Sequence, residues 1–305
     1  MLPYKSFISW EIGPLTIQSF GVMFAIAIAV GVYLALKQFK TKQEKENGYN
    51  IALLAVIFGL IGSRMLHVLQ YWDLYKGNWF SIINFIEGGL IWYGGLIGGL
   101  FASIVYIKIK KLDFWKLADI IAPSLAIGQA IGRIGCILGD GGHVGKLTTM
   151  PWGFNVNGEI RHVTAWYSMI NLFVLFFLLL KLRKRKPFTG FLFLFYLFYY
   201  SITTFVIDIY RTDPRYYGFT LTQYICVLMF LISGSLLFLN FRYTKKKMVK
   251  KKSEKSKTKK SVKTKEICPS CKSKDITLFM GGIFGKYKCK KCGYIGPLVV
   301  EEEEG

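Results

Sequence analysis

Three arginines stand inside or at the ends of apolar stretches of this chain, where charged side chains are rare. Arg133 lies in the run Gly-Arg-Ile-Gly-Cys at residues 132–136, and Arg64 and Arg211 have comparable settings. A guanidinium in lipid is costly, so it usually faces a protein interior, a wet cavity or a charged ligand. Because arginine grips phosphate oxygens in pairs and keeps its charge at any physiological pH, the three residues suit a phosphate-bearing lipid headgroup.

Two of these arginines also have a structural interpretation. Arg211 stands at helical spacing from Asp208, and could pair with that carboxylate or extend to the membrane interface. Arg64 lies deeper, and an ion pair with Asp119 or Asp140 would account for it. For Arg133 a ligand is the stronger interpretation, because the glycines on both sides of it let a ligand approach the backbone.

The elements that would position these residues are membrane-spanning helices. Of the residues, 52% are apolar, yet the formal net charge is +22, so apolar and charged residues must be segregated along the chain. A helix crosses a bilayer with about 20 apolar residues. The sequence predicts an all-α polytopic protein with seven spans, at 17–36, 51–69, 89–107, 117–138, 166–180, 190–209 and 221–239.

The orientation follows from the short loops, because lysine and arginine near span ends stay on the cytoplasmic side. The loops near 37–45, 108–116 and 181–186 are basic, whereas the alternate segments 71–88, 139–165 and 210–220 carry few cations and many aromatics. We therefore expect the N-terminus outside and the C-terminal tail inside. The three arginines then lie at a similar depth, near the outer interface, with three further residues: Tyr93, His143 and His162.

Glycines are frequent in the third span, at positions 94, 95, 98 and 99. Glycine at this spacing allows two helices to approach closely, and this packing role is favoured over contact with a ligand.

The C-terminal part of the chain has a different composition. We expect residues 1–241 to form the membrane domain, 242–266 a disordered lysine-rich linker, 267–300 a zinc ribbon and 301–305 an acidic tail. The linker has too few apolar groups to bury a core. Its lysines favour attraction to anionic lipid headgroups, and a nucleic-acid arm is the alternative.

Two C-x-x-C pairs define the expected ribbon. Four thiolates close a tetrahedral shell without an open position, so the metal would be a structural zinc, and no cofactor is expected for catalysis. Two disulfides are the alternative, which an inside location disfavours. Cys136 and Cys226, in the spans, are expected to be small apolar fillers. The expected metal ligands are Cys268, Cys271, Cys289 and Cys292.

Several motifs over the first 240 or so residues are similar to those of the prolipoprotein diacylglyceryl transferase family. They are Glu-Gly-Gly-Leu-Ile-Trp-Tyr-Gly-Gly-Leu-Ile-Gly-Gly at 87–99, Asp-Ile-Ile-Ala-Pro at 119–123, Gly128, Gly-Arg-Ile-Gly at 132–135 and Leu-Thr-Gln-Tyr at 221–224. The resemblance implies transfer of a diacylglyceryl group from phosphatidylglycerol to the thiol of a lipobox cysteine, outside the cytoplasm.

The chain also departs from the family pattern. Tyr93 stands where the family has histidine, Cys136 where it has asparagine, and Asp140 is the nearest carboxylate to a family glutamate. In the segment 162–168 the chain keeps His162 and Tyr167 but lacks the family's proline, glutamine and glutamate. The family's acid-x-x-arginine survives at 208–211, and Arg64 matches an arginine of the family's second span.

These patterns lead to a mechanistic hypothesis. Arg133 and Arg211 would hold the phosphodiester, and Tyr93 or His162 would take the proton of the attacking thiol. The expected binding residues are Arg64, Gly94, Gly95, Gly132, Asp140, His143, Tyr167 and Asp208. The expected partners are an anionic phospholipid, a prelipoprotein and the plasma membrane. Two alternatives stay open: a non-catalytic lipid or lipoprotein binder, and an adaptor whose ribbon recruits a cytoplasmic protein or nucleic acid.

Overall fold

The computed structural model describes residues 2–4, 7–12, 15–77, 79–83, 89–139, 143–261, 265–279, 286–296 and 300–302. The chain divides into two compact units, Met1–Phe241 and Arg242–Gly305. Each unit is described by itself below.

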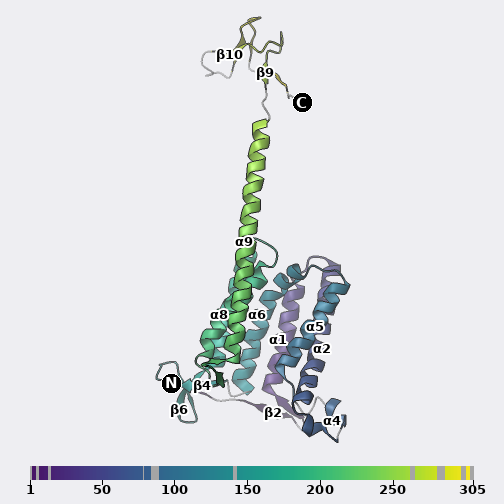
Figure 1. Cartoon of the computed structure of the whole chain (residues 1–305), viewed down its shortest axis with the longest axis vertical. Helices are drawn as coiled ribbons and strands as arrows, with labels where there is room; N and C mark the ends of the chain where they lie inside the picture. Colours follow the sequence, from purple (N-terminus) through teal and green to yellow (C-terminus); the bar gives the residue numbers. More distant parts are fainter. Residues whose placement is uncertain are drawn as a thin grey trace. The chain divides into compact units, whose positions relative to one another are not determined.

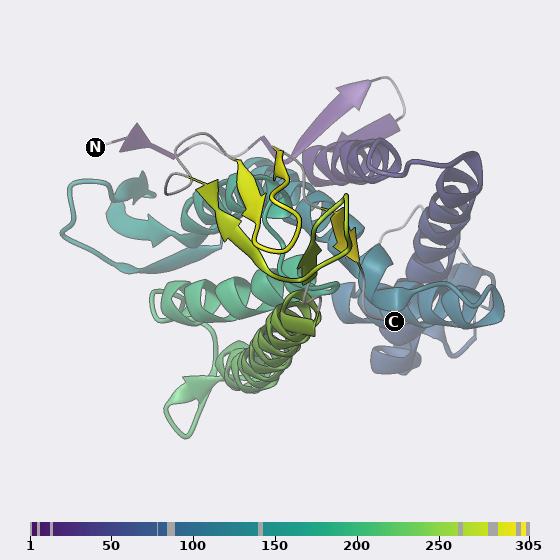
Figure 2. The same cartoon turned by 90° about the horizontal axis from the view of Figure 1, so that it is seen from above.

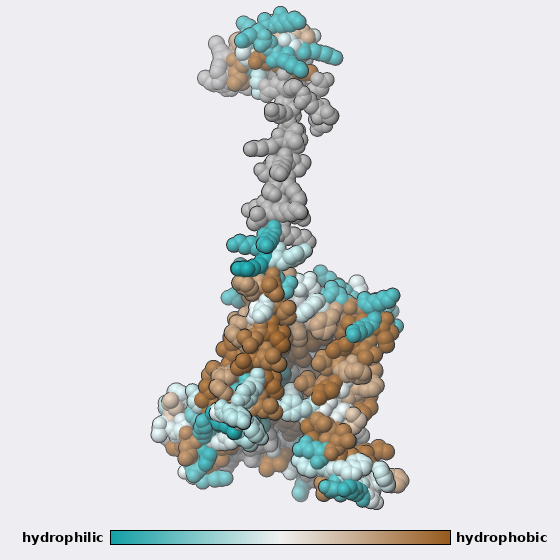
Figure 3. Space-filling view, in the orientation of Figure 1, coloured by the Kyte–Doolittle hydropathy of each residue, from teal (hydrophilic) through white to brown (hydrophobic). Residues whose placement is uncertain are grey.

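Seven helices of the described chain are long and apolar enough to cross a membrane, which confirms the predicted number of spans. On the face drawn in Figure 3, the sides of the first unit are mostly apolar, while polar residues gather toward its two ends. The seven helices are α1 (Ser19–Leu36), α2 (Lys42–Gln70), α5 (Trp92–Ile109), α6 (Phe114–Gly139), α7 (Thr164–Arg183), α8 (Phe191–Asp208) and α9 (Leu221–Ser261).

Helix α6 is the centre of the bundle and packs on α1, α7 and α8. Its small residues Ala122, Ala126 and Ala130 are fully buried in one cluster with leucines of α7 and α8. Figure 2 shows α2 and α5, in blue, on the side of the bundle opposite the green helices α7 and α8. Residues carried by α2 and α5 are therefore separated from those of α7 and α8.

Glycines bring α2 and α5 into backbone contact. A Cβ atom added to Gly62 would lie 2.5 Å from the carbonyl oxygen of Gly94 and 3.2 Å from the Cα of Gly98, and one added to Gly99 would lie 2.8 Å from the carbonyl oxygen of Ala55. These contacts leave no room for a side chain, so the glycines serve the close helix packing that their spacing indicates.

Short elements between the long helices gather at one end of the bundle, where β2, α4, β4 and β6 lie in Figure 1. The segment between α6 and α7 forms a four-stranded sheet with the chain start, in the order β1-β5-β6-β4. The short elements are β1 (Leu2–Pro3), β2 (Ser9–Ile12), β3 (Leu15–Gln18), α3 (Trp72–Tyr75), α4 (Trp79–Ile83), β4 (Val144–Leu147), β5 (Phe154–Val156), β6 (Glu159–Val163), β7 (Arg215–Tyr216) and β8 (Phe219–Thr220).

Asp119 of α6 completes the start of α8. Its carboxylate is 1% exposed and accepts hydrogen bonds from the backbone N–H groups of Gly190, Leu192 and Phe193 at 2.9, 2.9 and 3.2 Å. Gly190 has φ 93° and offers no capping side chain. The carboxylate satisfies N–H groups that a helix start leaves without partners. Asp119, one of the two expected partners of Arg64, is therefore not its partner, because this carboxylate binds α8 and Lys186. The other expected partner, Asp140, lies outside the described residues.

The second unit holds a small three-stranded antiparallel sheet, β10-β11-β12, and a separate pair, β9 with β13. The strands are β9 (Lys265–Ile267), β10 (Ile276–Leu278), β11 (Tyr287–Cys289), β12 (Ile295–Gly296) and β13 (Val300–Glu302).

Helix α9 continues to Ser261, into the lysine-rich segment, and the disorder expected for residues 242–266 stays a prediction. Residues 242–261 contain neither glycine nor proline, and lysine is a good helix former. Extending a helix that has already formed also avoids the cost of nucleation.

Candidate active site

A pocket opens where α6, α7 and α8 meet. Its cavity has a volume of about 20 Å³, room for about one water molecule, and it opens to solvent. Two arginines face it from separate parts of the chain, one on α6 and one just beyond α8. The remaining lining is mostly hydroxyl, amide and carboxylate groups. The pocket is lined by Arg133, Ser168, Asn171, Leu172, Tyr200, Thr204, Ile207, Asp208 and Arg211.

Arg133 has no hydrogen-bond or ion-pair partner among the described residues. It projects from the second-last turn of α6, which ends at Gly139. A Cβ atom added to the preceding Gly132 would meet nothing within 4 Å, so the backbone there borders open space. A guanidinium in an apolar bundle is costly without a partner, and an anion in this pocket would relieve that cost.

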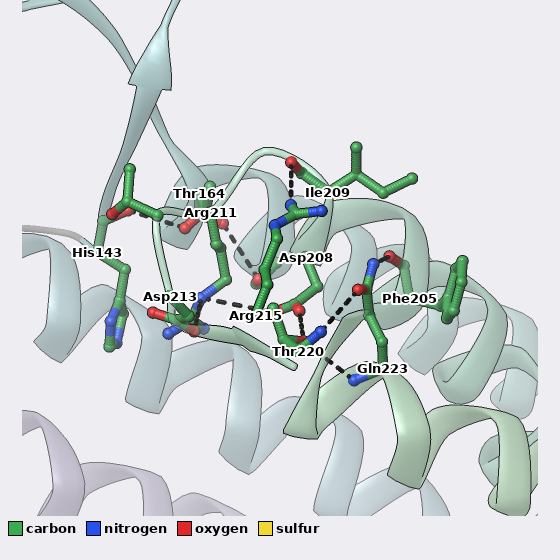
Figure 4. A network of polar contacts seen from close by, with 12 residues as sticks. His143, Thr164, Phe205, Asp208, Ile209, Arg211, Asp213, Arg215, Thr220 and Gln223 are labelled. Atoms are coloured by element: carbon green, nitrogen blue, oxygen red, sulfur yellow. Dashed lines mark hydrogen bonds and ion pairs between the residues drawn. The ribbon is translucent and has the colours of Figure 1, made fainter. Parts of the chain in front are cut away.

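Arg211 is held by carboxylates on one edge of its guanidinium. Its Nε lies 2.8 Å from Oδ2 of Asp213 and 3.5 Å from Oδ1 of Asp208, as drawn in Figure 4. The pairing with Asp208, which helical spacing made possible, is therefore present. It does not remove Arg211 from the pocket, which both residues line.

Asp208 is fixed from its other side by the start of α9. The Thr220 hydroxyl donates a hydrogen bond to Oδ2 of Asp208, and Thr220 also forms a capping box with Gln223. In this box the Gln223 N–H donates to the Thr220 hydroxyl at 3.1 Å, and the Thr220 N–H donates to Oε1 of Gln223 at 3.0 Å. The threonine-x-x-glutamine spacing before an apolar run is the sequence signal of this cap.

His162 on β6 lies in a small aromatic cluster with Tyr167 and Tyr210. Its Nδ1 is 2.7 Å from the Tyr167 hydroxyl, and the His162 and Tyr210 ring centroids are 4.8 Å apart. His162 is 6% exposed, and this burial lowers the pKa of its imidazole below the ordinary 6.5. The ring is therefore neutral at physiological pH. Each tyrosine adjoins a pocket residue in sequence, namely Ser168 and Arg211.

Arg64 and Tyr93 do not line this pocket. The Arg64 guanidinium donates to the carbonyl oxygens of Ser81, of Ile82 at 3.0 Å and of Gly89 at 3.3 Å, so it holds the α4 segment against α2. Tyr93 is half exposed in the first turn of α5, with its ring against Trp92.

Three other expected residues lie elsewhere. His143 has φ 50°, and its carbonyl oxygen accepts bonds from the backbone N–H and hydroxyl of Thr164, at the start of α7. Gly94 and Gly95 lie in the α5 surface that meets α2. Asp140 lies outside the described residues.

The four ribbon cysteines come together in the second unit, and their sulfur atoms all lie within 4.8 Å of one another. The closest pairs are Cys268–Cys292 at 3.6 Å and Cys271–Cys289 at 3.5 Å. No disulfide joins any of the six cysteines. Tetrahedral zinc with bonds of about 2.3 Å holds its sulfurs about 3.8 Å apart, so the cluster fits a metal ion of this kind.

The two knuckles share one turn geometry. Lys272 donates its N–H to the carbonyl oxygen of Cys268 at 2.9 Å, and Gly293 donates to that of Cys289 at 3.0 Å. Both donors have positive φ, 54° and 78°. Backbone N–H groups of Cys292 and Lys291 also lower the pKa of the Cys289 thiol to about 6, which favours its thiolate, whereas hydrogen bonds with the neighbouring sulfurs and burial raise the pKa of Cys271 to about 12.

Seven apolar helices define the first unit as a multi-pass membrane protein. The family model described as prolipoprotein diacylglyceryl transferase matches residues 7–239. The chain belongs to this family of transferases, whose work is lipoprotein biosynthesis. The matched region ends before the cysteine cluster.

Individual relatives agree with this assignment. The phosphatidylglycerol–prolipoprotein diacylglyceryl transferase of Clostridioides difficile strain 630 is 38% identical over 200 residues, which cover 65% of this chain and 80% of the relative. A protein of the same name from Listeria innocua is 34% identical over 241 residues, or 74% and 87% of the two chains. One from Bacillus cytotoxicus is 35% identical over 230 residues, or 71% and 85%.

Proposed function

We propose that this chain transfers a diacylglyceryl group from a phosphatidylglycerol-type phospholipid to the cysteine thiol of a prelipoprotein. The observation that carries the proposal is the shared pocket of Arg133 and Arg211, two cations from separate elements within an apolar bundle. The names of the relatives supply the substrate classes. Two guanidinium groups suit a phosphodiester chemically, because each offers a planar set of donors to phosphate oxygens.

In the proposed step, the thiolate sulfur attacks the glyceryl carbon that is bonded to the phosphate oxygen. A carbon–sulfur bond forms, the carbon–oxygen bond breaks, and the phosphate leaves as a glycerol phosphate monoester with one more negative charge. Arg133 can pair with the departing phosphate, since no carboxylate among the described residues binds its guanidinium. Arg211, fixed by Asp208 and Asp213, contributes a positioned charge. Stabilisation of this kind is strongest in a site of low dielectric.

The thiol must lose a proton, and His162 is the base that the geometry favours over Tyr93. Its neutral imidazole can accept the proton, either directly or through the Tyr167 hydroxyl 2.7 Å away. The cluster adjoins the pocket through Ser168 and Arg211. Tyr93 stands on α5, away from these residues, and its assignment as a base stays a prediction, as do the binding assignments of Arg64, Gly94, Gly95, Asp140 and His143.

The proposed orientation places the pocket toward the outer leaflet of the plasma membrane and the ribbon in the cytoplasm. Two observations support this orientation. The basic loops follow α1, α5 and α7, and Arg133 and Arg211 lie at the other end of the bundle, with the aromatic-rich loops. Cysteine accessibility to a membrane-impermeant reagent tests this topology. A cysteine introduced at Lys146 should react from outside in intact cells, and one at Lys184 should not.

The direct test of function uses protein reconstituted in phosphatidylglycerol and a lipobox peptide. Expected products are a thioether-lipidated peptide and glycerol phosphate, both followed by mass spectrometry. Replacing the donor with phosphatidylcholine should stop the reaction. Binding of both substrates without either product would instead indicate the non-catalytic binder.

For the second unit we propose a structural zinc ion bound by Cys268, Cys271, Cys289 and Cys292. Four thiolates would complete its coordination and supply the folding free energy of a unit too small to fold on its apolar area. Metal analysis of the purified full chain should find zinc at one equivalent, and a fourfold cysteine-to-serine variant should contain none.

A further inference from the structure

One face of the ribbon sheet carries three lysines in a line. β10 and β11 pair with Thr277 opposite Lys288, and this register continues beyond both ends of the strands. At one end Phe279 donates its N–H to the Lys286 carbonyl oxygen at 2.9 Å, and at the other Lys290 donates to that of Asp275 at 2.9 Å. Alternate residues of an extended strand share a face, so Lys286 and Lys288 project from one side. Lys290, in the turn that follows β11, continues the same backbone pairing, and these three lysines are called the lysine row.

The lysine row lies on the side of the sheet opposite the metal cluster. Cys289, which stands between two members of the row, is 2% exposed and faces the other way. All three lysines are exposed. The lysine side chains are therefore accessible to a partner. The cysteines stabilise the sheet that carries the lysine row and do not contact the partner.

Two of the three lysines of the row have no acidic cross-strand neighbour. Asp275 lies opposite Lys290, and the cross-strand neighbours of the other two lysines carry no charge: Phe279 opposite Lys286, and Thr277 and Ile295 beside Lys288. Ile295 is 43% exposed and Phe279 is half-buried. The face thus combines a line of cations with apolar side chains at its edge.

We propose that the lysine row binds the phosphate backbone of single-stranded nucleic acid. Alternate residues of a strand stand about 7 Å apart, a spacing similar to that of successive phosphates in an extended polynucleotide. Release of counterions by lysine–phosphate contacts drives such binding without sequence preference. Ile295 and Phe279 offer the apolar surface that bases cover in single-strand sites.

The linear arrangement of the lysine row favours a single-stranded nucleic acid over a lipid surface. Anionic headgroups spread in two dimensions and would use any exposed lysine of the ribbon equally. The ribbon has further exposed lysines outside the row, at 272, 274 and 291. A polynucleotide lying along β11 would use the row and not these three.

The test compares two triple variants of the full chain, both removing three charges from the same module. The row variant is Lys286→Gln, Lys288→Gln and Lys290→Gln, and the control variant is Lys272→Gln, Lys274→Gln and Lys291→Gln. Each protein is placed in phosphatidylcholine nanodiscs, with its metal content checked. Binding of a fluorescent single-stranded RNA, longer than the roughly 4–16 nucleotides of a typical site, is measured by anisotropy across a salt series.

The row variant should bind about tenfold more weakly, and the slope of log K against log salt should decrease in magnitude by about 2, the value for three lost phosphate contacts. The control variant should stay within about threefold of the parent. The lysines of α9 are unchanged in both variants, so any RNA binding by them is the same in the two proteins. Equal losses in the two variants, or an unchanged slope in the row variant, would overturn the proposal. So would a row variant whose defect appears only with anionic vesicles and not with RNA.

Discussion

Asp208 at the end of α8 and Thr220 before α9 are joined by a buried side-chain hydrogen bond across the loop that carries Arg211. Both residues are almost inaccessible, at 1% and 2% exposure. The bond ties the position of Arg211 to the start of the last span. The arginine therefore depends on a threonine that does not line the pocket.

Replacing Thr220 with valine should destabilise the membrane unit. The change removes the helix cap and leaves a buried carboxylate oxygen without its donor, a loss of about 1–3 kcal/mol. Thermal unfolding in detergent measures it, and Thr222→Val, two positions further into α9, is the matched control. If both variants have the melting temperature of the parent, the hydrogen bond does not stabilise the protein.

Arg133→Lys should lower transfer at least about a hundredfold, because a point charge cannot replace a planar donor set at the departing phosphate. The folded protein should be unchanged, which its elution and melting profiles would report. Arg183→Lys, the same change on an exposed residue at the other end of the bundle, should leave the rate intact. Full activity of Arg133→Lys would contradict the proposed role.

The pH dependence of transfer should identify the base. Because burial lowers the pKa of His162, its neutral, accepting form persists below pH 6.5 and is lost only as pH falls through the lowered pKa. The acid limb of kcat/KM should therefore have its midpoint below 6.5. The same limb should be absent from His162→Gln and present in Tyr93→Phe; a limb that persists in His162→Gln would contradict the assignment of the base to His162.

Gly62→Ala should loosen the pairing of α2 with α5. The new methyl group would stand 2.5 Å from the Gly94 carbonyl oxygen, so the two backbones must separate. We expect a destabilisation of about 1–3 kcal/mol, typical of overpacking. Gly21→Ala on α1, where an added Cβ atom meets nothing within 4 Å, is the control. Equal melting temperatures for the two variants would show that the contact is not needed.

Removing metal should unfold the ribbon and spare the membrane unit. Chelation should make the four ribbon thiols reactive to a thiol reagent, since the metal supplies their folding free energy. Transfer should continue at the parent rate, because the family match ends at residue 239. Loss of transfer on chelation would instead link the ribbon to catalysis.

Much of this architecture follows from composition and spacing. Hydrophobic length alone located the seven spans, and the two C-x-x-C pairs indicated the cluster that the structure forms. Depth also predicted correctly that Arg133 and Arg211 lie near the same end. Arg64 and Tyr93 show the limit of that reasoning, because depth carries no information about which helices are neighbours. The glycines pair α5 with α2, so Arg64 on α2 and Tyr93 on α5 lie away from the pocket.

Other features depend on partners distant in sequence. Nothing near Asp119 reveals that its carboxylate serves the start of α8, and nothing near Arg64 reveals that its guanidinium donates to the backbone carbonyl oxygens of Ile82 and Gly89. The helical continuation of α9 had a local signal, the absence of glycine and proline. The high charge of that segment is the competing signal, which predicts disorder.

The carboxylate at the start of α8 has a consequence for biosynthesis. The amides that it satisfies are made after it, since Asp119 leaves the ribosome before Gly190. Helix α6 can thus enter the bilayer first, and its Asp119 carboxylate is already present when α8, which has no side-chain cap of its own, is inserted. Insertion from the N-terminus onward then proceeds in the order that this pairing needs, and a circularly permuted chain that makes α8 first would lack the acceptor when α8 arrives.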